Sequence, residues 1–152
     1  MGTVWLTDDQ QRAWRAYLRM QARLTAELHR QLQADSGLSL SDYEVLVQLS
    51  EASSGRLRPY ALQQALDWEQ SRLSHHLARM QRRGLVLRQA CADDGRGAYV
   101  AITDEGRDTL AAAAPAHVAA VRKLFFDQLD PDQVRAVEAL SAGVLKALDP
   151  PS

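Results

Sequence analysis

The chain of 152 residues lacks the features that mark secreted and membrane proteins. Its single cysteine cannot form an internal disulfide, which is consistent with a reducing compartment. The longest uncharged run, TLAAAAPAHVAAV, has 13 residues, fewer than the roughly 20 that a membrane-spanning helix needs. The N-terminus has neither the basic nor the apolar region of a signal peptide. We therefore expect a cytoplasmic protein without a membrane partner.

Signatures of catalysis, cofactor binding and metal binding are also missing. No Ser, His and Asp spacing, paired-carboxylate cleft or phosphate-binding loop stands out. The glycine-rich strand-to-helix turn that a cofactor-binding domain needs does not occur before the sequence ends. The 4 histidines show no H-x-x-x-H spacing and the lone cysteine no C-x-x-C, so no preformed metal site is expected. These absences predict a protein that is not an enzyme and that carries neither a metal nor another cofactor.

Positive charge is concentrated in the segment 71–88. SRLSHHLARMQRRGLVLR contains five arginines and no acidic residue, in a chain whose formal net charge is only -1. Leu73, Leu77 and Met80 repeat at i, i+4 and i+7, which predicts an amphipathic helix. The opposite side of this helix carries Ser71, Arg72, His75, Ala78, Arg79 and Arg82. One face is therefore apolar and the other cationic, which suits the DNA major groove but is also compatible with a solvated helix.

A β-hairpin is predicted directly after this helix. Gly84 stands where a left-handed residue would end the helix, and LVLRQA is typical of a strand. Asp94-Gly95 precedes a second run, AYVAIT, and Asp-Gly between two such runs is a strong hairpin signal. Arg96 at the predicted tip is long enough to enter a minor groove. A basic helix followed by a β-ribbon indicates a winged helix-turn-helix and favours DNA as its partner.

The other half of the motif precedes the basic helix. Pro59 fits the first turn of a short positioning helix. The apolar face of this helix consists of Leu62, Ala65 and Leu66. We expect Asp67 to cap the basic helix, with Gln70 completing a D-x-x-Q capping box, and Trp68 to lie in the core. Two arginines that could contact phosphate flank the positioning helix, Arg56 and Arg58.

The order of these elements resembles that of the MarR family of bacterial transcriptional regulators. The resemblance rests on LSLSDYEVLVQL, ALQQALDWEQSRLSHHLARMQRRGLVLR and DDGRGAYVAITDEG, and it extends across nearly the whole chain. Asp94-Gly95-Arg96 matches the D-x-R motif of the family's wing, and Ile102-Thr103-Asp104-Glu105-Gly106 matches its strand-to-helix junction. The resemblance implies a homodimer whose outer helices form the interface and whose two wings grip DNA.

The predicted fold is mainly α with a small antiparallel β-hairpin wing, a winged helix-turn-helix with N- and C-terminal dimerisation helices. A chain of 152 residues has room for one domain. We assign 37–103 to the DNA-binding lobe and 1–36 with 104–152 to the dimerisation helices. Apolar residues on these helices that need a partner are Trp5, Trp14, Leu124, Phe125, Phe126 and Leu129. A second copy is preferred over packing within one subunit, because helix-turn-helix sites are usually two-fold.

Capping patterns predict the ends of the first two helices. One helix is expected over 8–35. A second follows an S-x-x-E capping box at Ser41 and Glu44. The stretch SSGRLRP at 53–59 is expected to be a loop.

The same reasoning applies to the C-terminal helices. Thr103 can cap a helix that runs toward Asp127, with a bend or break at Pro115. A last helix should begin at Asp130, followed by Pro131 in its first turn.

The residues predicted to contact DNA lie on the basic helix and the wing. They are Gln70, Ser71, Arg72, Ser74, His75, Arg79, Arg82, Asp94 and Arg96. Arg72 and Arg79 are the first choices for base reading, because arginine can contact guanine with two hydrogen bonds. Phosphate neutralisation or solvation is expected of Arg82, Arg83 and Arg88. Asp94 is expected to orient Arg96 through a hydrogen-bonded ion pair.

The resemblance implies two ways in which DNA binding could be regulated, by a small molecule or by oxidation of a cysteine. Members of the family often bind small aromatic or phenolic compounds between the dimerisation helices and the lobe and then release DNA. Side chains that could line such a cavity, or equally be ordinary core, are Trp14, Tyr17, Met20 and Tyr43. Peroxide-sensing members carry a reactive cysteine in the first helix, whereas Cys91 lies on the predicted wing strand. A lone cysteine on a strand is more often an inert apolar residue than a redox sensor. A redox-responsive regulator that uses Cys91 is therefore only the alternative.

The sequence as a whole predicts a sequence-specific transcriptional regulator. The expected partners are double-stranded DNA with an inverted-repeat operator, a second copy of the chain and a small-molecule effector, and the expected role is that of a repressor. The alternative is a winged helix used for protein contacts or dimerisation without DNA binding.

Overall fold

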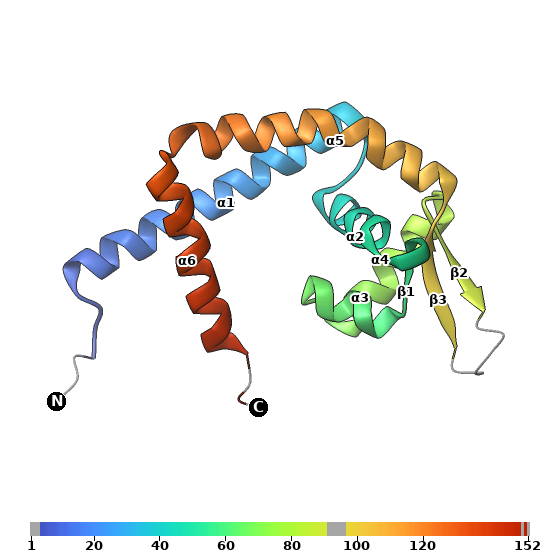
Figure 1. Cartoon of the computed structure of the whole chain (residues 1–152), viewed down its shortest axis with the longest axis horizontal. Helices are drawn as coiled ribbons and strands as arrows, with labels where there is room; N and C mark the ends of the chain where they lie inside the picture. The colour runs from blue at the N-terminus through green and yellow to red at the C-terminus, as the bar shows by residue number, and fades with distance from the viewer. Residues whose placement is uncertain (1–3, 91–96, 150, 152) are drawn as a thin grey trace.

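The computed structural model, which describes residues 4–90, 97–149 and 151, consists of a long helical arm and a smaller lobe (Figure 1). The arm contains α1 (Asp8–Ser36), α5 (Asp104–Leu124) and α6 (Pro131–Leu148). The lobe contains α2 (Leu40–Glu51), β1 (Arg56–Leu57), α3 (Pro59–Leu66), α4 (Gln70–Arg82), β2 (Val86–Ala90) and β3 (Ala98–Ile102). Short 3-10 turns, η1 (Ser53–Gly55) and η2 (Phe126–Gln128), precede β1 and α6. The predicted class, mainly α with a small antiparallel sheet, is confirmed.

The sheet has three strands where the sequence predicts two. β3 lies in the middle and pairs antiparallel with β2, from Val86 opposite Ile102 to Ala90 opposite Ala98. On its other side β3 pairs with β1, with Arg56 opposite Ala101. The loop prediction for 53–59 is therefore wrong at β1. A strand of two residues is too short to show the alternation from which strands are predicted.

The core of the lobe lies between its three helices and the sheet. The predicted apolar stripe of α4 faces this core, and Leu73, Leu77 and Met80 are all buried. Trp68 is buried as predicted. Other fully buried side chains come from each neighbouring element and include Val45, Leu46, Leu49, Leu62 and Val100. Since this stripe is buried, the basic side of α4 must face outward.

The N-cap predicted for α2 is displaced by two residues. Ser39 caps the helix: its Oγ accepts from the backbone N–H of Asp42 at 2.9 Å, and the Asp42 carboxylate accepts from the N–H of Ser39 at 2.9 Å. The expected box at Ser41 and Glu44 is wrong. LSLSDYE contains S-x-x-D and S-x-x-E in overlapping positions, and the earlier one forms the cap.

The cap predicted for α4 is also wrong. Asp67 has a left-handed backbone, with φ 55°, and ends α3. Glu69 precedes α4 without a side-chain cap. The D-x-x-Q box therefore does not form, because Asp67 is already used to reverse the chain between the two helices.

The long helices of the arm follow the predictions closely at their starts. Thr103 caps α5, and its Oγ1 accepts from the N–H of Gly106 at 2.9 Å. α5 continues through Pro115 without a break and ends at Leu124, short of the expected Asp127. The packing of α5 along α1 (Figure 1) offsets the hydrogen bond that proline removes. The predicted start of the last helix at Asp130 is confirmed, and Asp130 and Gln133 form a capping box there.

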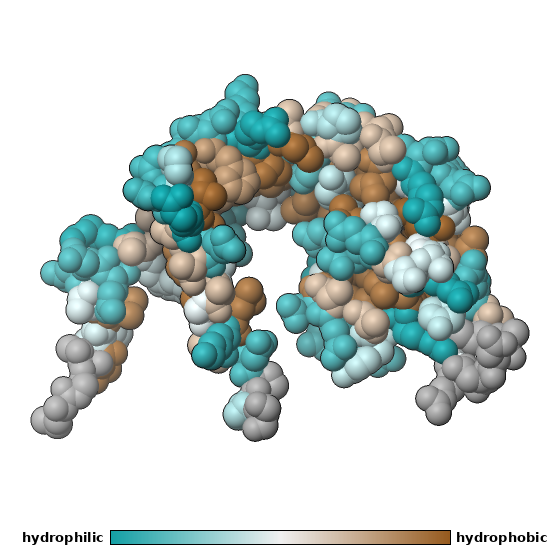
Figure 2. All heavy atoms as spheres, in the orientation of Figure 1, coloured by the Kyte–Doolittle hydropathy of each residue, from teal (hydrophilic) through white to brown (hydrophobic). Residues whose placement is uncertain are grey.

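The final helix stands apart from the lobe. Figure 2 shows open space between α6 and the lobe, with hydrophobic side chains along α6 and where the arm helices meet. None of the residues of α6, all of which the structure describes, is buried. Leu140 and Val144 are each 56% exposed. The apolar face of α6 therefore lacks a partner among the residues that the structure describes. Among the described residues, no helix has both the length and the apolarity to cross a membrane.

The start of α5 lies against the turn between α4 and β2, which leaves no room for a side chain at Gly106. A Cβ there would overlap the carbonyl oxygen of Leu85 and press on Ile102. We expect Gly106→Ala to lower the free energy of unfolding by about 1–3 kcal/mol, since backbone cannot move aside cheaply. Urea denaturation measures this. Gly143→Ala in α6 is the control, because no heavy atom lies within 4 Å of its added Cβ; equal destabilisation of both variants would contradict the prediction.

Candidate nucleic-acid interface

The outer side of α4 forms a continuous polar and basic surface. We call it the α4 face, and it consists of the exposed residues Gln70, Ser71, Arg72, Ser74, His75, Arg79 and Arg82. No acidic residue occurs in α4, and no side chain caps its first turn. The positive end of the helix dipole and the first backbone N–H groups therefore add to the attraction for an anion.

Arg72 rests on the lobe through a stacked contact. Its guanidinium carbon lies 3.9 Å from the centroid of the Trp68 ring, and its Nη2 donates to Ser41 Oγ at 3.3 Å. An arginine over an indole face gains cation–π attraction. The guanidinium has five N–H donors, so this arrangement leaves others available to a ligand.

Arg79 is held by a different set of groups. Its Nη2 lies 3.1 Å from His76 Nδ1. His76 is only 8% exposed, and its ring meets the edge of Trp68 with centroids 5.4 Å apart. On the other side of the imidazole, Nε2 lies 2.8 Å from Asp42 Oδ1, although off the line of an ideal hydrogen bond. A buried chain of polar contacts thus connects α2 to the α4 face.

Arg83 is exposed, but its guanidinium joins the same cluster of polar contacts. Its Nη1 donates to Asp42 Oδ2 at 2.6 Å and its Nη2 to the carbonyl oxygen of Gly37 at 3.1 Å. Burial by itself would raise the pKa of the Asp42 carboxyl, but hydrogen bonds from His76 and Arg83 hold that pKa well below its ordinary value. Arg83 therefore connects the end of α4 to the start of α2, and phosphate binding by its remaining donors stays a prediction.

Low pH should weaken the interaction of Asp42 with Arg83 and His76. A carboxyl whose pKa is depressed in the folded state contributes stability above its unfolded pKa of about 3.9, and that stability is lost as the pH falls further. Asp42→Asn should therefore lower the free energy of unfolding at neutral pH by about 2–3 kcal/mol and reduce the loss below about pH 4. This loss is smaller than for a fully buried ion pair, because the Arg83 side chain is 44% exposed and solvent screens its charge. Urea denaturation at both pH values measures it.

The exposed ion pair of Asp132 with Arg135 provides the matched control. Asp132→Asn should change the free energy of unfolding by less than about 1 kcal/mol at either pH, because solvent screens the pair. An Asp42→Asn variant with the pH dependence of the unaltered protein would show that the buried carboxylate has no such role.

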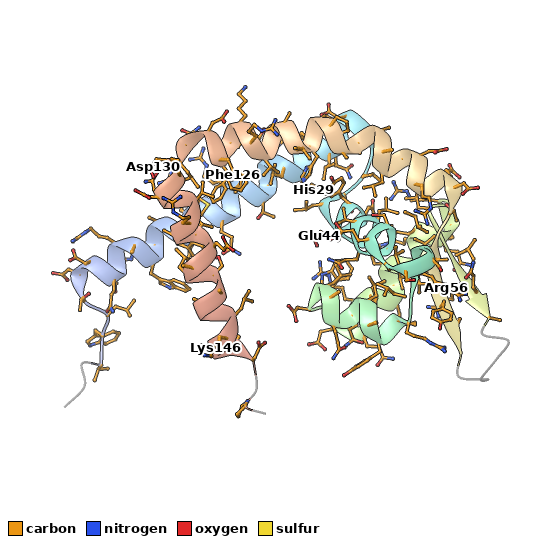
Figure 3. The ribbon with its side chains drawn as sticks, in the orientation of Figure 1. His29, Glu44, Arg56, Phe126, Asp130 and Lys146 are labelled. Atoms are coloured by element: carbon orange, nitrogen blue, oxygen red, sulfur yellow. The ribbon has the colours of Figure 1, made fainter. Side chains whose placement is uncertain are left out.

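The two arginines around the positioning helix α3 both lie on one tyrosine. The guanidinium carbons of Arg56 and Arg58 are 4.2 and 4.3 Å from the centroid of the Tyr99 ring. Arg56 also donates to Gln89 Oε1 at 3.3 Å, and Figure 3 shows it at the base of the sheet. These contacts join β1 to the wing strands. Phosphate binding by the two arginines, and by the exposed Arg88 of β2, stays a prediction.

The predicted tip of the wing lies outside the described residues. Asp94, Arg96 and Cys91 all belong to this segment. Their expected roles in minor-groove contact, in orienting that contact and in redox sensing stay predictions.

The residues expected to line an effector cavity do not come together. Trp14 and Tyr17 stack on each other with centroids 5.9 Å apart and are exposed on α1. Met20 lines an open hollow of about 730 Å³, together with Leu124 and Phe125. Tyr43 lies elsewhere, on α2. In the single chain these four side chains therefore do not line one cavity, and an effector site made of them stays a prediction.

A separate cavity of about 410 Å³ lies between α2, the end of α3 and α5. Its lining includes Leu40, Tyr43, Glu44, Val47, Gln48, Leu66 and His117. The rings of Tyr43 and His117 are 4.4 Å apart, and His117 Nδ1 lies 3.1 Å from Gln31 Oε1. Burial raises the pKa of Tyr43 and lowers that of His117, so both side chains are neutral near pH 7. Burial also raises the pKa of Glu44, which Arg72 opposes; Figure 3 places Glu44 on α2.

The four histidines lie in different surroundings. His29 accepts from the N–H of Leu40 at 3.2 Å where the arm crosses α2 (Figure 3). His75 is exposed, whereas His76 and His117 are buried at different sites. Within 4–90, 97–149 and 151, no three His, Cys, Asp or Glu side chains gather closely enough to hold a metal ion.

A short helix, a tight turn, a basic helix with its apolar side in the core and an antiparallel sheet define a winged helix-turn-helix protein. Solved structures share this fold over nearly the whole chain. AbsC, a MarR family transcriptional regulator from Streptomyces coelicolor, is 40% identical, with 96% of this chain and 98% of that chain covered and a TM-score of 0.92. Sco3205, a MarR family transcriptional regulator from the same organism solved in complex with DNA, is 39% identical, with 97% and 93% covered and a TM-score of 0.93. This chain therefore belongs to the MarR family of transcriptional regulators, as the sequence motifs indicate.

The fold extends to more distant proteins. CouR from Rhodococcus jostii RHA1, solved bound to p-coumaroyl-CoA, is 21% identical, with 99% of this chain and 100% of that chain covered and a TM-score of 0.75. That likeness shows the fold alone. No family model matches the chain, and no curated protein matches it.

Proposed function

We propose that the protein is a homodimeric, sequence-specific transcriptional repressor that inserts α4 into the DNA major groove of an inverted-repeat operator. The observation that carries the proposal is the α4 face, a basic surface without acidic residues whose apolar reverse is locked in the core. A helix of this kind fits the major groove. The relative Sco3205, 39% identical, was solved with DNA.

The residues divide into two groups by their reach. Arg72 and Arg79 read bases, since each is supported from behind and keeps N–H donors for guanine O6 and N7. Near the start of α4, Gln70, Ser71, Ser74 and His75 contact bases or phosphates. At the end of α4, Arg82 contacts phosphate. Arg96 enters the minor groove, oriented by Asp94.

Dimerisation is proposed through the arm, with 1–36 and 104–152 as its segments and 37–103 as the DNA-binding lobe of one domain. Within 4–90, 97–149 and 151, nothing covers the apolar face of α6, and Trp5 and Trp14 of the N-terminal segment are exposed. A symmetric copy would cover both regions and bring two α4 helices to half-sites about 10 bp apart. Operator symmetry follows from that arrangement.

The direct test is fluorescence anisotropy with the DNA upstream of the protein's own gene. Binding is expected to be tighter to one inverted repeat than to scrambled DNA by a factor of about 1,000 or more. A promoter–reporter assay then distinguishes repression from activation. Failure of the chain to retain any DNA at low salt would overturn the proposal and favour a winged helix used only for protein contacts.

A small-molecule effector is the second element of the proposal, and the cavity between α2, α3 and α5 is its site. The neutral Tyr43 and His117 side chains can exchange hydrogen bonds with a phenolic compound. An effector releases DNA only if it prefers a dimer whose α4 helices are wrongly spaced, because equal affinity for both states shifts nothing. The anisotropy assay repeated with a panel of phenols tests this element, and unchanged DNA binding with every compound would remove it.

A further inference from the structure

We infer that His76 is a positioning residue for sequence reading, because it holds the guanidinium of Arg79 in the orientation in which Arg79 meets its base. The inference rests on the proposed function and adds to it a buried side chain that does not itself touch DNA. His76 is 8% exposed and lies on the core side of α4, whereas Arg79 is exposed on the α4 face.

The contacts of His76 determine which ring nitrogen carries the proton. A guanidinium can only donate hydrogen bonds, so His76 Nδ1, 3.1 Å from Arg79 Nη2, must be the acceptor. The proton of the neutral imidazole is then on Nε2, which lies 2.8 Å from Asp42 Oδ1. A carboxylate next to one ring nitrogen favours a proton there and leaves the other nitrogen free to accept.

Asp42 is itself fixed from two further directions. It accepts from Arg83 at 2.6 Å and from the N–H of Ser39 at 2.9 Å. The orientation of Arg79 is therefore set by a continuous line of contacts that starts at the cap of α2. An arginine ordered before binding loses less conformational freedom when it meets DNA, and one of its five N–H donors is enough to hold it.

Arg72 provides a comparison within α4, because its own contacts are with Trp68 and Ser41 Oγ rather than with His76. The His76 ring does meet the Trp68 ring. Changes at His76 should thus weaken discrimination more at the base pair read by Arg79 than at the one read by Arg72. Ser41→Ala should weaken discrimination at the Arg72 base pair only.

The test is a double-mutant cycle read out as base discrimination. Affinities for the operator and for each single base-pair substitution are measured for the unaltered protein, Arg79→Ala, His76→Gln and the two changes combined. Arg79→Ala should lose roughly 5- to 150-fold discrimination at one base pair in each half-site. His76→Gln keeps a donor toward Asp42 but removes the acceptor at Nδ1, so it should lose discrimination at the same base pair. The combined variant should be no worse there than Arg79→Ala.

His76→Asn is the rescue variant, since its carbonyl oxygen can take the place of Nδ1. It should retain most of the discrimination at the Arg79 base pair. Retained discrimination in His76→Gln, or an equal loss on every operator including those changed at the Arg72 base pair, would overturn the inference and leave the proposed function intact. No preference of the unaltered protein for any DNA sequence would instead overturn the proposed function.

A second measurement does not depend on the folding of any His76 variant. Long-range proton–nitrogen NMR of the unaltered protein should show His76 protonated on Nε2, and the Nδ1 resonance should shift in the surface variant Arg79→Ala. A proton on Nδ1, or an Nδ1 resonance unaffected by Arg79→Ala, would also overturn the inference.

Discussion

Replacement of both Arg72 and Arg79 by alanine is expected to weaken operator binding by about 100-fold or more, and to lower the stability of the fold only modestly, through loss of the contacts with Trp68 and His76. Each bidentate arginine–guanine contact is worth roughly 1–3 kcal/mol of discrimination, and a dimer would make each contact twice. Affinity for scrambled DNA should fall far less, because phosphate contacts supply most non-specific binding. Anisotropy titrations on operator and scrambled duplexes measure both quantities.

Arg122→Ala is the control for loss of charge alone. Arg122 is exposed in the last turn of α5, on the arm rather than the lobe. Its removal should leave the preference for the operator unchanged. If the double variant lost equal affinity for operator and scrambled DNA, the two arginines would be phosphate contacts and α4 would not read sequence.

Leu140→Asp combined with Val144→Asp is expected to convert a dimer into monomers at micromolar concentration. Both side chains are 56% exposed in the single chain and lie on the apolar face of α6. If a partner covers this face, two-fold symmetry buries four new carboxylates, and each unpaired buried charge costs several kcal/mol. Operator affinity should fall with dimerisation, since one subunit reaches only one half-site.

Ala139→Asp is the matched control, because residue 139 lies on the opposite side of α6 and is exposed. It adds the same charge to the same helix and should leave the dimer intact. Analytical ultracentrifugation measures the mass of each species. A dimer that persists in the double variant, or one that both kinds of substitution break equally, would show that the interface lies elsewhere.

Local patterns predict most of the fold correctly. The spacing of Leu73, Leu77 and Met80 identifies α4 and its buried side, because helical periodicity is visible within a few residues of sequence. Gly84, with φ 78°, and Asp130, with its reciprocal cap, are likewise local signals. Where two local signals overlap, as in LSLSDYE, the sequence does not show which serine caps α2, and the structure has Ser39 in that role.

The site is less predictable because its contacts are distant in sequence. Arg83 and Asp42 are 41 residues apart, and nothing next to Arg83 in the sequence distinguishes it from Arg82. The contact of His76 with Asp42 depends on how α2 packs against α4. The resemblance to the family places Trp14, Tyr17 and Tyr43 near one cavity, whereas in the structure Trp14 and Tyr17 are exposed on α1 and Tyr43 lies on α2.

Hydroxyl-radical footprinting of the unaltered protein on its operator tests the central claim most directly, namely that two copies of α4 read one duplex. Two protected segments related by a dyad, with centres about 10 bp apart, are expected. Protection of a single segment, or uniform cleavage at a protein concentration that saturates binding, would contradict a dimer that reads DNA through paired α4 helices.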